Sequence, residues 1–149
     1  MAGRPQTPDA IARNVETVHT FLRLLEEKDI DSWIELWAEG ADHYYPFGTR
    51  MFPAHIVGKT AVYSRWSNTP DMFESWRFPI TDTWADGDTV IARFEGDCVL
   101  TDSGRHYRNN YLSIFKFTDD GQIHAYWEYF DPIIAAEYFG LAEVRYTTP

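Results

Sequence analysis

Apolar residues recur every three or four positions near the start of the chain, as they do along a helix with one buried face. The positions are Ile11, Val15, Val18, Leu22 and Leu25. Thr7 and Pro8 come shortly before them, and a capping residue followed by a proline is typical of a helix start. The pattern predicts one long amphipathic helix.

Two shorter helices and a strand are predicted next. One helix begins after Asp29 or Asp31, because either aspartate can cap it. Its apolar stripe consists of Trp33, Leu36 and Trp37. Residues 41–48 are typical of a short strand, which Pro46 interrupts. Residues 57–68 have the pattern of a third helix.

From residue 72 onward the segments are typical of β-strands. Four such segments follow one another, at 72–85, 89–100, 105–117 and 122–130. Short turn segments containing Asp and Gly separate them, at 86–88, 101–104 and 119–121. Consecutive strands joined this tightly must pair as antiparallel hairpins. Residues 132–140 add a last short helix, with a proline at its start and a glycine past its end.

The order of these elements predicts the fold class. A single sheet must cover one face with something, and the N-terminal helices are the only candidates. We therefore expect an α+β fold in which a curved antiparallel sheet wraps around the helices. The length of 149 residues fits one domain over 1–149. Within it, we expect 1–6 to be a flexible N-terminus and 141–149 to be a C-terminal tail.

The composition disfavours several classes of protein. A net charge of −10 repels phosphate backbones, so nucleic acid is not an expected partner. No run of about 18 apolar residues is present, and the N-terminal segment has no apolar signal sequence, so no membrane contact is expected. Cys98 is the single cysteine, which excludes an internal disulfide and a thiolate-rich metal site. A cytoplasmic protein is the expectation that follows.

Aromatic residues make up 17% of the chain, and they gather around a carboxylate in the segment AYWEYFDP. An aromatic content this high suits a pocket for flat or bulky organic ligands, or equally a core and a subunit interface with large side chains. Glu128 lies inside this apolar segment. Its carboxylate must find a partner, keep water, or raise its pKa and hold a proton.

The turn at 119–121 decides which residues surround Glu128. A three-residue loop with glycine in the left-handed position places Glu128 opposite Leu112. Because side chains alternate between the faces of a strand, four residues would then share one face. They are Arg108, Asn110, Glu128 and Phe130. A two-residue turn would shift the register by one residue and separate Glu128 from Arg108.

The three-residue loop leads to a catalytic hypothesis. Arg108 would keep Glu128 ionised and lower its pKa through charge-assisted hydrogen bonds. Asn110 would orient a water molecule or bind a substrate oxygen. Glu128 would then activate that water, or abstract a proton from a carbon next to a carbonyl. The alternative is a buried ion pair between neighbouring strands that has no chemical role.

Other residues are candidates for binding a substrate. His43 can act as an acid or base near neutral pH, and Tyr45 can donate a hydrogen bond to a carbonyl, although both also suit an ordinary strand start. Asp131 precedes a proline and suits either a helix cap or the pocket. Trp66 and Phe130 complete the predicted substrate-binding set. The histidines are scattered singly and no phosphate-binding loop is present, so we expect neither a metal nor a cofactor.

The segment NNYLSIFKFTDDGQIHAYWEYFDP resembles the SnoaL-like and ketosteroid-isomerase-like group of the nuclear-transport-factor-2-like superfamily. Members of that group typically end in a strand, an Asp-Gly-x-Ile hairpin and a Trp-x-(Glu/Asp)-Tyr-Phe-Asp-Pro segment. The strong match covers about residues 107–140, and the remainder agrees in the order of elements. The resemblance implies a cone-shaped sheet with a pocket inside, of the type called a cystatin-like roll.

Two branches of the superfamily have a related site. In limonene-epoxide-hydrolase-like proteins, an Arg-x-Asp on one strand and a carboxylate on the next activate water and protonate the epoxide. Arg108 and Glu128 match this pattern, whereas Asn110 replaces the proton-donating aspartate. In phenazine-biosynthesis A/B proteins, a glutamate at the position of Glu128 is the acid–base group that condenses ketone intermediates. Arg65 stands roughly where the pocket histidine of those proteins is expected.

These observations lead to three hypotheses about function. The first is a cofactor-independent enzyme that isomerises, cyclises, dehydrates or adds water to a small, mostly apolar carbonyl or polycyclic compound. The second is a protein that binds such a ligand in the same pocket without changing it. The third is an assembly subunit whose aromatic residues lie mainly on an exposed sheet face. The resemblance also implies a homodimer formed through the outer face of the sheet, where Arg93, Glu95 and Asp97 alternate, although a solvated face explains these charges equally well.

Overall fold

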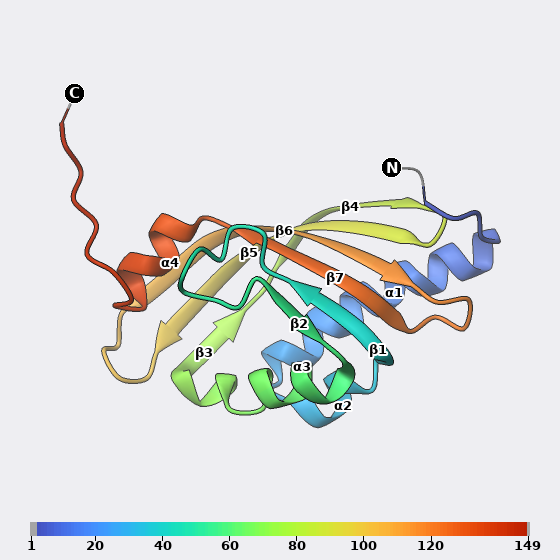
Figure 1. The fold of residues 1–149 in the computed structure, drawn as a ribbon, viewed down its shortest axis with the longest axis horizontal. Helices are drawn as coiled ribbons and strands as arrows, with labels where there is room; N and C mark the ends of the chain where they lie inside the picture. Colours follow the sequence, from blue (N-terminus) through green and yellow to red (C-terminus); the bar gives the residue numbers. More distant parts are fainter. Residues whose placement is uncertain (1–2, 149) are drawn as a thin grey trace.

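The computed structural model describes residues 3–148, and in it four helices accompany one seven-stranded sheet (Figure 1). The helices are α1 (Pro8–Glu26), α2 (Ile30–Ile34), α3 (Lys59–Trp66) and α4 (Pro132–Tyr138), with a 3-10 turn η1 (Thr69–Met72). The strands are β1 (Trp37–Tyr44), β2 (His55–Val57), β3 (Phe73–Arg77), β4 (Ile80–Asp86), β5 (Thr89–Leu100), β6 (His106–Phe117) and β7 (Ile123–Phe130).

The sheet confirms the α+β class and is mixed rather than purely antiparallel. Its strand order is β2-β1-β7-β6-β5-β3, and β4 also pairs with β5. Strands β1 and β7 are the parallel pair, while the other pairs are antiparallel. A parallel arrangement is open to these two strands because a long stretch of chain separates them, whereas tight turns force the hairpins to be antiparallel.

Helix α1 forms where the apolar spacing predicted it. The Thr7 hydroxyl accepts a hydrogen bond from the backbone N–H of Ala10, which caps the helix start. Val18, Leu22 and Leu25 are buried, so the predicted stripe faces the core. The helix runs along the concave face of the curved sheet (Figure 1).

The second helix is shorter than predicted. Asp29 caps it by accepting from the backbone N–H of Ser32, and the helix ends at Ile34. The prediction that Trp37 belongs to its apolar stripe was wrong, because Trp37 begins β1. Trp33 and Trp37 are both fully buried, with ring centroids 5.2 Å apart. A spacing of four residues thus brings two indoles together across a helix–strand junction as well as along a helix.

Two further elements differ from the predicted order. The segment 72–85 is split into β3 and β4, which pair with different parts of β5. Pro79 lies between them, and a proline cannot donate the N–H that a continuous ladder requires. The three-residue strand β2, which pairs with β1, was not predicted because it is too short to show a period.

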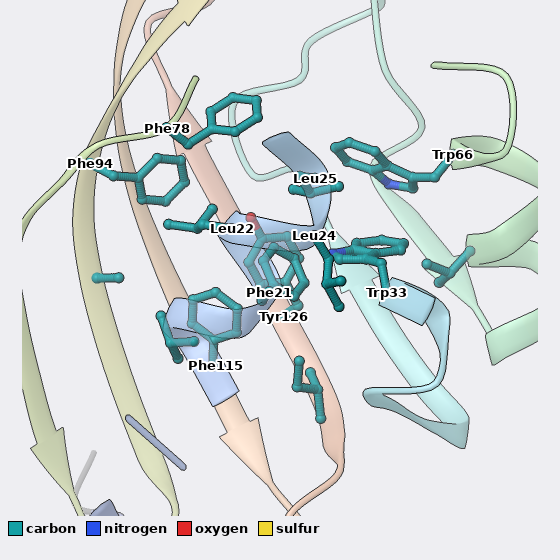
Figure 2. Close-up of a cluster of buried hydrophobic side chains, with 14 of the residues drawn as sticks. Phe21, Leu22, Leu24, Leu25, Trp33, Trp66, Phe78, Phe94, Phe115 and Tyr126 are labelled. Carbon is teal, nitrogen blue, oxygen red and sulfur yellow. The ribbon is translucent and has the colours of Figure 1, made fainter. Parts of the chain in front are cut away.

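The core lies between α1 and the inner face of the sheet. Phe21 of α1 packs against Phe115 of β6 and Tyr126 of β7, with centroid distances of 5.0 and 5.1 Å. Figure 2 shows the α1 side chains between Phe78 and Phe94 on one side and Trp33 and Trp66 on the other. The aromatic-rich composition therefore fills this interior rather than only a surface.

The segments that begin at residue 3 and end at residue 148 lie at opposite ends of the structure in Figure 1. The backbone N–H groups of Gly3 and Arg4 donate to the carboxylates of Asp86 and Asp88, each at 2.9 Å, while residues 1–2 of the expected flexible segment lie outside the described residues. Residues 141–148 extend away from α4, and residue 149 lies outside the description. None of the helices within residues 3–148 combines the length and hydropathy that a membrane span requires.

Candidate active site

The hairpin of β6 and β7 places Glu128, and its turn has the predicted form. The N–H of Thr118 donates to the carbonyl of Gln122 at 2.8 Å, and Gly121 has a φ of 87°. The ladder then contains a bulge at His124, because Phe117 pairs with Ile123 whereas Lys116 pairs with Ala125. The bulge shifts all later pairs by one residue.

This shift overturns the predicted surroundings of Glu128. Its partner on β6 is Ser113, so the prediction of Leu112 was wrong. A slip of one residue exchanges the two faces of a strand, and Arg108 and Asn110 therefore lie on the outer face. The Arg108 side chain is 71% exposed and forms an ion pair with Asp97 at 3.5 Å. The predicted convergence of Arg108 and Asn110 on Glu128 was wrong.

Glu128 itself points inward, as the hypothesis required. The residue is only 8% exposed, and burial raises the pKa of its carboxyl to about 8. The Tyr126 hydroxyl, 3.4 Å from Oε1, and the positive charge of Arg65 act on this pKa in the opposite direction but are outweighed. Glu128 is therefore mostly a carboxylic acid at neutral pH and becomes a carboxylate in mildly alkaline solution.

His43 is a second ionisable neighbour of Glu128, after Tyr126. It comes from β1 and is fully buried, and burial together with the charge of Arg65 lowers its pKa to about 3. The indole N–H of Trp66 lies 3.5 Å from Nδ1 and can only donate, which places the imidazole hydrogen on Nε2. No hydrogen-bond partner of Nε2 is present within residues 3–148.

The contact between His43 and Glu128 joins two neutral groups. His43 Nε2 is 3.9 Å from Glu128 Oε2, a distance that would suit an ion pair. The pKa directions leave the imidazole unprotonated and the carboxyl protonated at neutral pH, so we assign no ion pair there. When Glu128 ionises, the Nε2–H group can approach Oε2, while the Tyr126 hydroxyl donates to Oε1.

A cavity of about 340 Å³ opens beside Glu128, a volume that suits a small organic ligand. Its wall is mainly aromatic and includes Tyr45, Trp66, Phe94, Tyr107, Tyr111 and Phe130. Glu128 and Arg65 contribute charged or ionisable groups to the same wall. The structure thus brings together Tyr45, Trp66, Phe130 and Glu128 from the predicted set, with His43 directly behind them.

Asp131 has the helix-capping position, one of the two alternatives predicted for it. Its Oδ1 accepts from the backbone N–H groups of Ile133 and Ile134, at 2.9 and 3.2 Å, at the start of α4. Asp131 does not line the cavity. Cys98 does, and burial raises the pKa of its thiol to about 12, so it is a thiol rather than a nucleophilic thiolate.

The polar residues of the inner face of β6 were not among the predicted site residues. Tyr107, Asn109 and Tyr111 alternate with Arg108 and Asn110, and the predicted register assigned the wrong set to the pocket. The alternation of two aromatic residues around an amide was visible in the sequence and would have identified them. Within residues 3–148, no three His, Cys, Asp or Glu side chains are grouped in a way that could hold a metal ion.

Comparison with known proteins identifies the family of this chain. The model of the SnoaL-like domain family matches residues 18–126 of the chain. The protein belongs to the SnoaL-like family. The fold of the nuclear-transport-factor-2-like superfamily, which the hairpin motif implied, is thereby confirmed.

Two relatives and a solved structure are similar to this SnoaL-like chain. YesE of Bacillus subtilis (strain 168) is 36% identical over 127 residues, which cover 84% of this chain and 86% of YesE. The PhzA/B-like protein PA3332 of Pseudomonas aeruginosa is 30% identical over 130 residues, covering 85% and 89% of the two chains. The crystal structure of a Bacillus subtilis protein described as a candidate isomerase has a TM-score of 0.78 and 31% identity, covering 91% of this chain and 99% of that one.

Proposed function

We propose that this protein is a cofactor-independent acid–base enzyme that moves a proton on a small, mostly apolar carbonyl compound. The observation that supports it best is Glu128, a carboxyl with a pKa of about 8 in the wall of an aromatic cavity. A catalytic acid or base works best when its pKa lies near the working pH. The description of the similar Bacillus subtilis structure as a candidate isomerase is consistent with this reaction class.

The proposed step moves one proton and one electron pair. The Glu128 carboxylate takes a proton from the carbon next to the carbonyl group, and the electron pair of that C–H bond forms a carbon–carbon double bond. The carbonyl oxygen then carries the negative charge of an enolate. If the Glu128 carboxylic acid first exchanges this proton with solvent and then protonates the same carbon, the result is hydrogen exchange. If it protonates a conjugated carbon instead, the result is isomerisation. His43 is a positioning residue in this step, because its Nε2–H faces Glu128 Oε2.

The cavity also bears on the two other hypotheses. An assembly subunit needs its aromatic residues mainly outside, whereas Trp33, Trp37, Tyr107 and Tyr126 are fully buried here. A protein that only binds a ligand can use the same cavity, so the two remaining functions must be separated by chemistry rather than by binding.

Hydrogen exchange of small ketones that contain an aromatic ring, measured in D₂O, tests the proposal. With 1-indanone or 2-tetralone as the probe, the wild-type protein should accelerate loss of the α-hydrogen signals in proton NMR. The protein-dependent rate should rise with pH and level off above about pH 8, because the base is the ionised form of Glu128. Glu128→Gln should lower the rate by about 10²–10⁴-fold.

Arg108→Gln is the matched control, since it also removes a charge from the β6–β7 hairpin but on the outer face. Its exchange rate should equal that of the wild type. An undiminished rate in Glu128→Gln would show that Glu128 is not the base. Binding of the ketones without any acceleration of exchange would favour the non-catalytic ligand-binding function instead.

A further inference from the structure

Three polar side chains on the inner face of β6 form a continuous chain of hydrogen bonds beside Glu128. They are every second residue of the strand: Tyr107, Asn109 and Tyr111. The hydroxyls of Tyr107 and Tyr111 are 2.7 Å apart, and Asn109 Nδ2 donates to the Tyr107 oxygen at 2.7 Å. Both tyrosines line the cavity, and Asn109 is buried behind them.

The orientation of the Asn109 amide is fixed by its other contacts. Oδ1 accepts from the backbone N–H groups of Asn110 and Asp131, at 2.8 and 3.1 Å. Nδ2 donates to the Asp131 carbonyl at 3.0 Å as well as to Tyr107. Rotating the amide by 180° would place its hydrogens against two N–H donors. The Tyr107 oxygen therefore receives a hydrogen and cannot give one to Asn109.

This fixed amide sets the direction of the bond between the two tyrosines. Tyr107 is only 1% exposed, and within residues 3–148 the Tyr111 oxygen is the acceptor available to its hydroxyl hydrogen. The opposite direction would leave that hydrogen buried without an acceptor, which is costly. Burial raises the pKa of both phenols well above the usual value, so both keep their protons. Tyr107 thus donates to Tyr111, and the Tyr111 hydroxyl hydrogen is free to donate to a ligand in the cavity.

The ring of Tyr111 is held in one position. It stacks on Phe94 with a centroid distance of 5.1 Å and an interplanar angle of 4°. A Cβ atom at Gly96 would lie 2.7 Å from Tyr111 Cε2, so the ring can occupy this place only because residue 96 has no side chain. A donor that is fixed before a ligand arrives loses little conformational entropy on binding.

Tyr111 and Glu128 can contact one ligand at the same time. On the paired strands Tyr111 lies opposite Phe130, and Ser113 lies opposite Glu128. Tyr111 and Glu128 are therefore diagonal neighbours on the inner face, and the Cα atoms of such neighbours are about 7–8 Å apart. This span suits a molecule whose carbonyl oxygen meets one group while the adjacent carbon meets the other.

We infer that Tyr111 is the end of a directed donor chain, Asn109 to Tyr107 to Tyr111, whose last hydroxyl binds the carbonyl oxygen of a flat aromatic ketone. The assignment rests on the proposed function, because that function places the ketone's α-carbon at Glu128. The same hydroxyl stabilises the oxygen when it becomes an enolate, since a hydrogen bond to a charged acceptor is stronger than one to a neutral acceptor.

The carbonyl stretching frequency of bound 2-acetylnaphthalene tests the inference without turnover. In the wild-type complex, infrared difference spectroscopy with a ¹³C-labelled carbonyl should show a lower frequency than in cyclohexane. Tyr111→Phe should return the frequency close to the cyclohexane value and weaken binding about five- to tenfold. Tyr107→Phe should leave a smaller downshift, because the Tyr111 hydroxyl remains but is no longer polarised by its neighbour.

Two further variants separate the hydroxyl from the packing around it. Gly96→Ala keeps all three members of the donor chain but displaces the Tyr111 ring, and it should also lose the downshift. Tyr129→Phe removes a hydroxyl on the outer face of β7 and should leave the frequency and the affinity unchanged. Circular dichroism of each variant checks that it is folded. If Tyr111→Phe does not fold, the spectrum of the Gly96→Ala complex provides the test in its place.

The outcomes distinguish this inference from the proposal about Glu128. An unchanged carbonyl frequency in both Tyr111→Phe and Gly96→Ala would overturn the inference, as would a wild-type frequency equal to that in cyclohexane. A downshift that disappears in Glu128→Gln alone would overturn it too, because the donor would then be the Glu128 carboxylic acid. A downshift that depends on Tyr111, combined with unchanged hydrogen exchange in Glu128→Gln, would support the donor chain and reject the base.

Discussion

The two faces of the β6–β7 hairpin hold charged residues in opposite ways. On the inner face Glu128 is 8% exposed, has no Lys or Arg of residues 3–148 within ion-pair distance, and has a pKa raised to about 8. On the outer face the Arg108 side chain is 71% exposed and forms an ion pair with Asp97 on β5. The comparison teaches that burial without a charged partner, rather than the residue type, makes a group titrate near neutral pH.

Aromatic rings pack on both faces of the sheet. On the outer face Tyr44 stacks nearly parallel to His55 and Trp127, with interplanar angles of 9° and 10°. On the inner face Tyr111 stacks on Phe94 with an interplanar angle of 4°. The two faces therefore differ in the burial of their ionisable side chains rather than in the geometry of their aromatic pairs.

The largest effect should come from adding a second carboxylate to the inner face. Phe115→Asp removes a fully buried ring and places a charge where no cavity or partner receives it. We expect the free energy of unfolding to fall by about 5 kcal/mol or more, which is a large fraction of the total stability of a typical domain. Urea denaturation followed by circular dichroism measures the change.

Ile114→Asp is the matched control on the outer face, where Ile114 pairs with Trp127 and remains partly exposed. Its cost should be below about 2 kcal/mol, because water can still reach the carboxylate. Equal losses for the two variants would mean that the faces do not differ in burial as described.

A smaller effect is expected from the charge of Glu128 itself. The folded-state pKa of about 8 lies above the ordinary value of 4.5, so the folded protein holds a proton that the unfolded chain has released. The contribution of Glu128 to stability is therefore fully present below about pH 4.5 and is lost as the pH rises through 8. Glu128→Gln cannot ionise, and its stability relative to the wild type should increase by about 3–5 kcal/mol between pH 5 and pH 9.

Chemical denaturation at a series of pH values measures this difference. Glu95→Gln on the exposed face of β5 is the control and should show no comparable increase relative to the wild type. A constant stability difference between Glu128→Gln and the wild type across this range would show that Glu128 is solvated or ionised in the folded protein at all of these values.

The smallest effect on stability is expected from replacing Arg108. Arg108→Ala removes an exposed ion pair, which is typically worth 1 kcal/mol or less, so the melting temperature should change by only a few degrees. Differential scanning calorimetry at low and high salt measures it. A decrease of more than about 2 kcal/mol in the free energy of unfolding would indicate that Arg108 also stabilises the packing of the inner face.

Much of the fold could be predicted from local patterns. The spacing of apolar residues located α1, and the Asp-Gly turn at 119–121 was predicted with the correct loop and a left-handed Gly121. Both features depend on residues close together in the chain. The junction at Trp37 was mispredicted because a buried residue four positions after Trp33 fits a helix and a following strand equally well.

The candidate site was only half predictable. Glu128 could be recognised as an unusual carboxylate from the rings beside it in the sequence. The neighbours predicted for Glu128 were wrong because the strand contains a bulge at His124. A bulge is a change in backbone hydrogen bonding, and no residue type in this segment indicates it. The bulge moved Arg108 outward and brought Tyr111 inward.

The sequence by itself determined that a carboxylate stands in an aromatic strand after a tight hairpin, since these facts depend on adjacent residues. Only the tertiary structure decided what that carboxylate meets. His43 on β1 and Arg65 on α3 reach it from distant parts of the chain, and the ladder register selects one of two faces. The burial that sets its pKa is a property of all these elements together, and no short segment contains it.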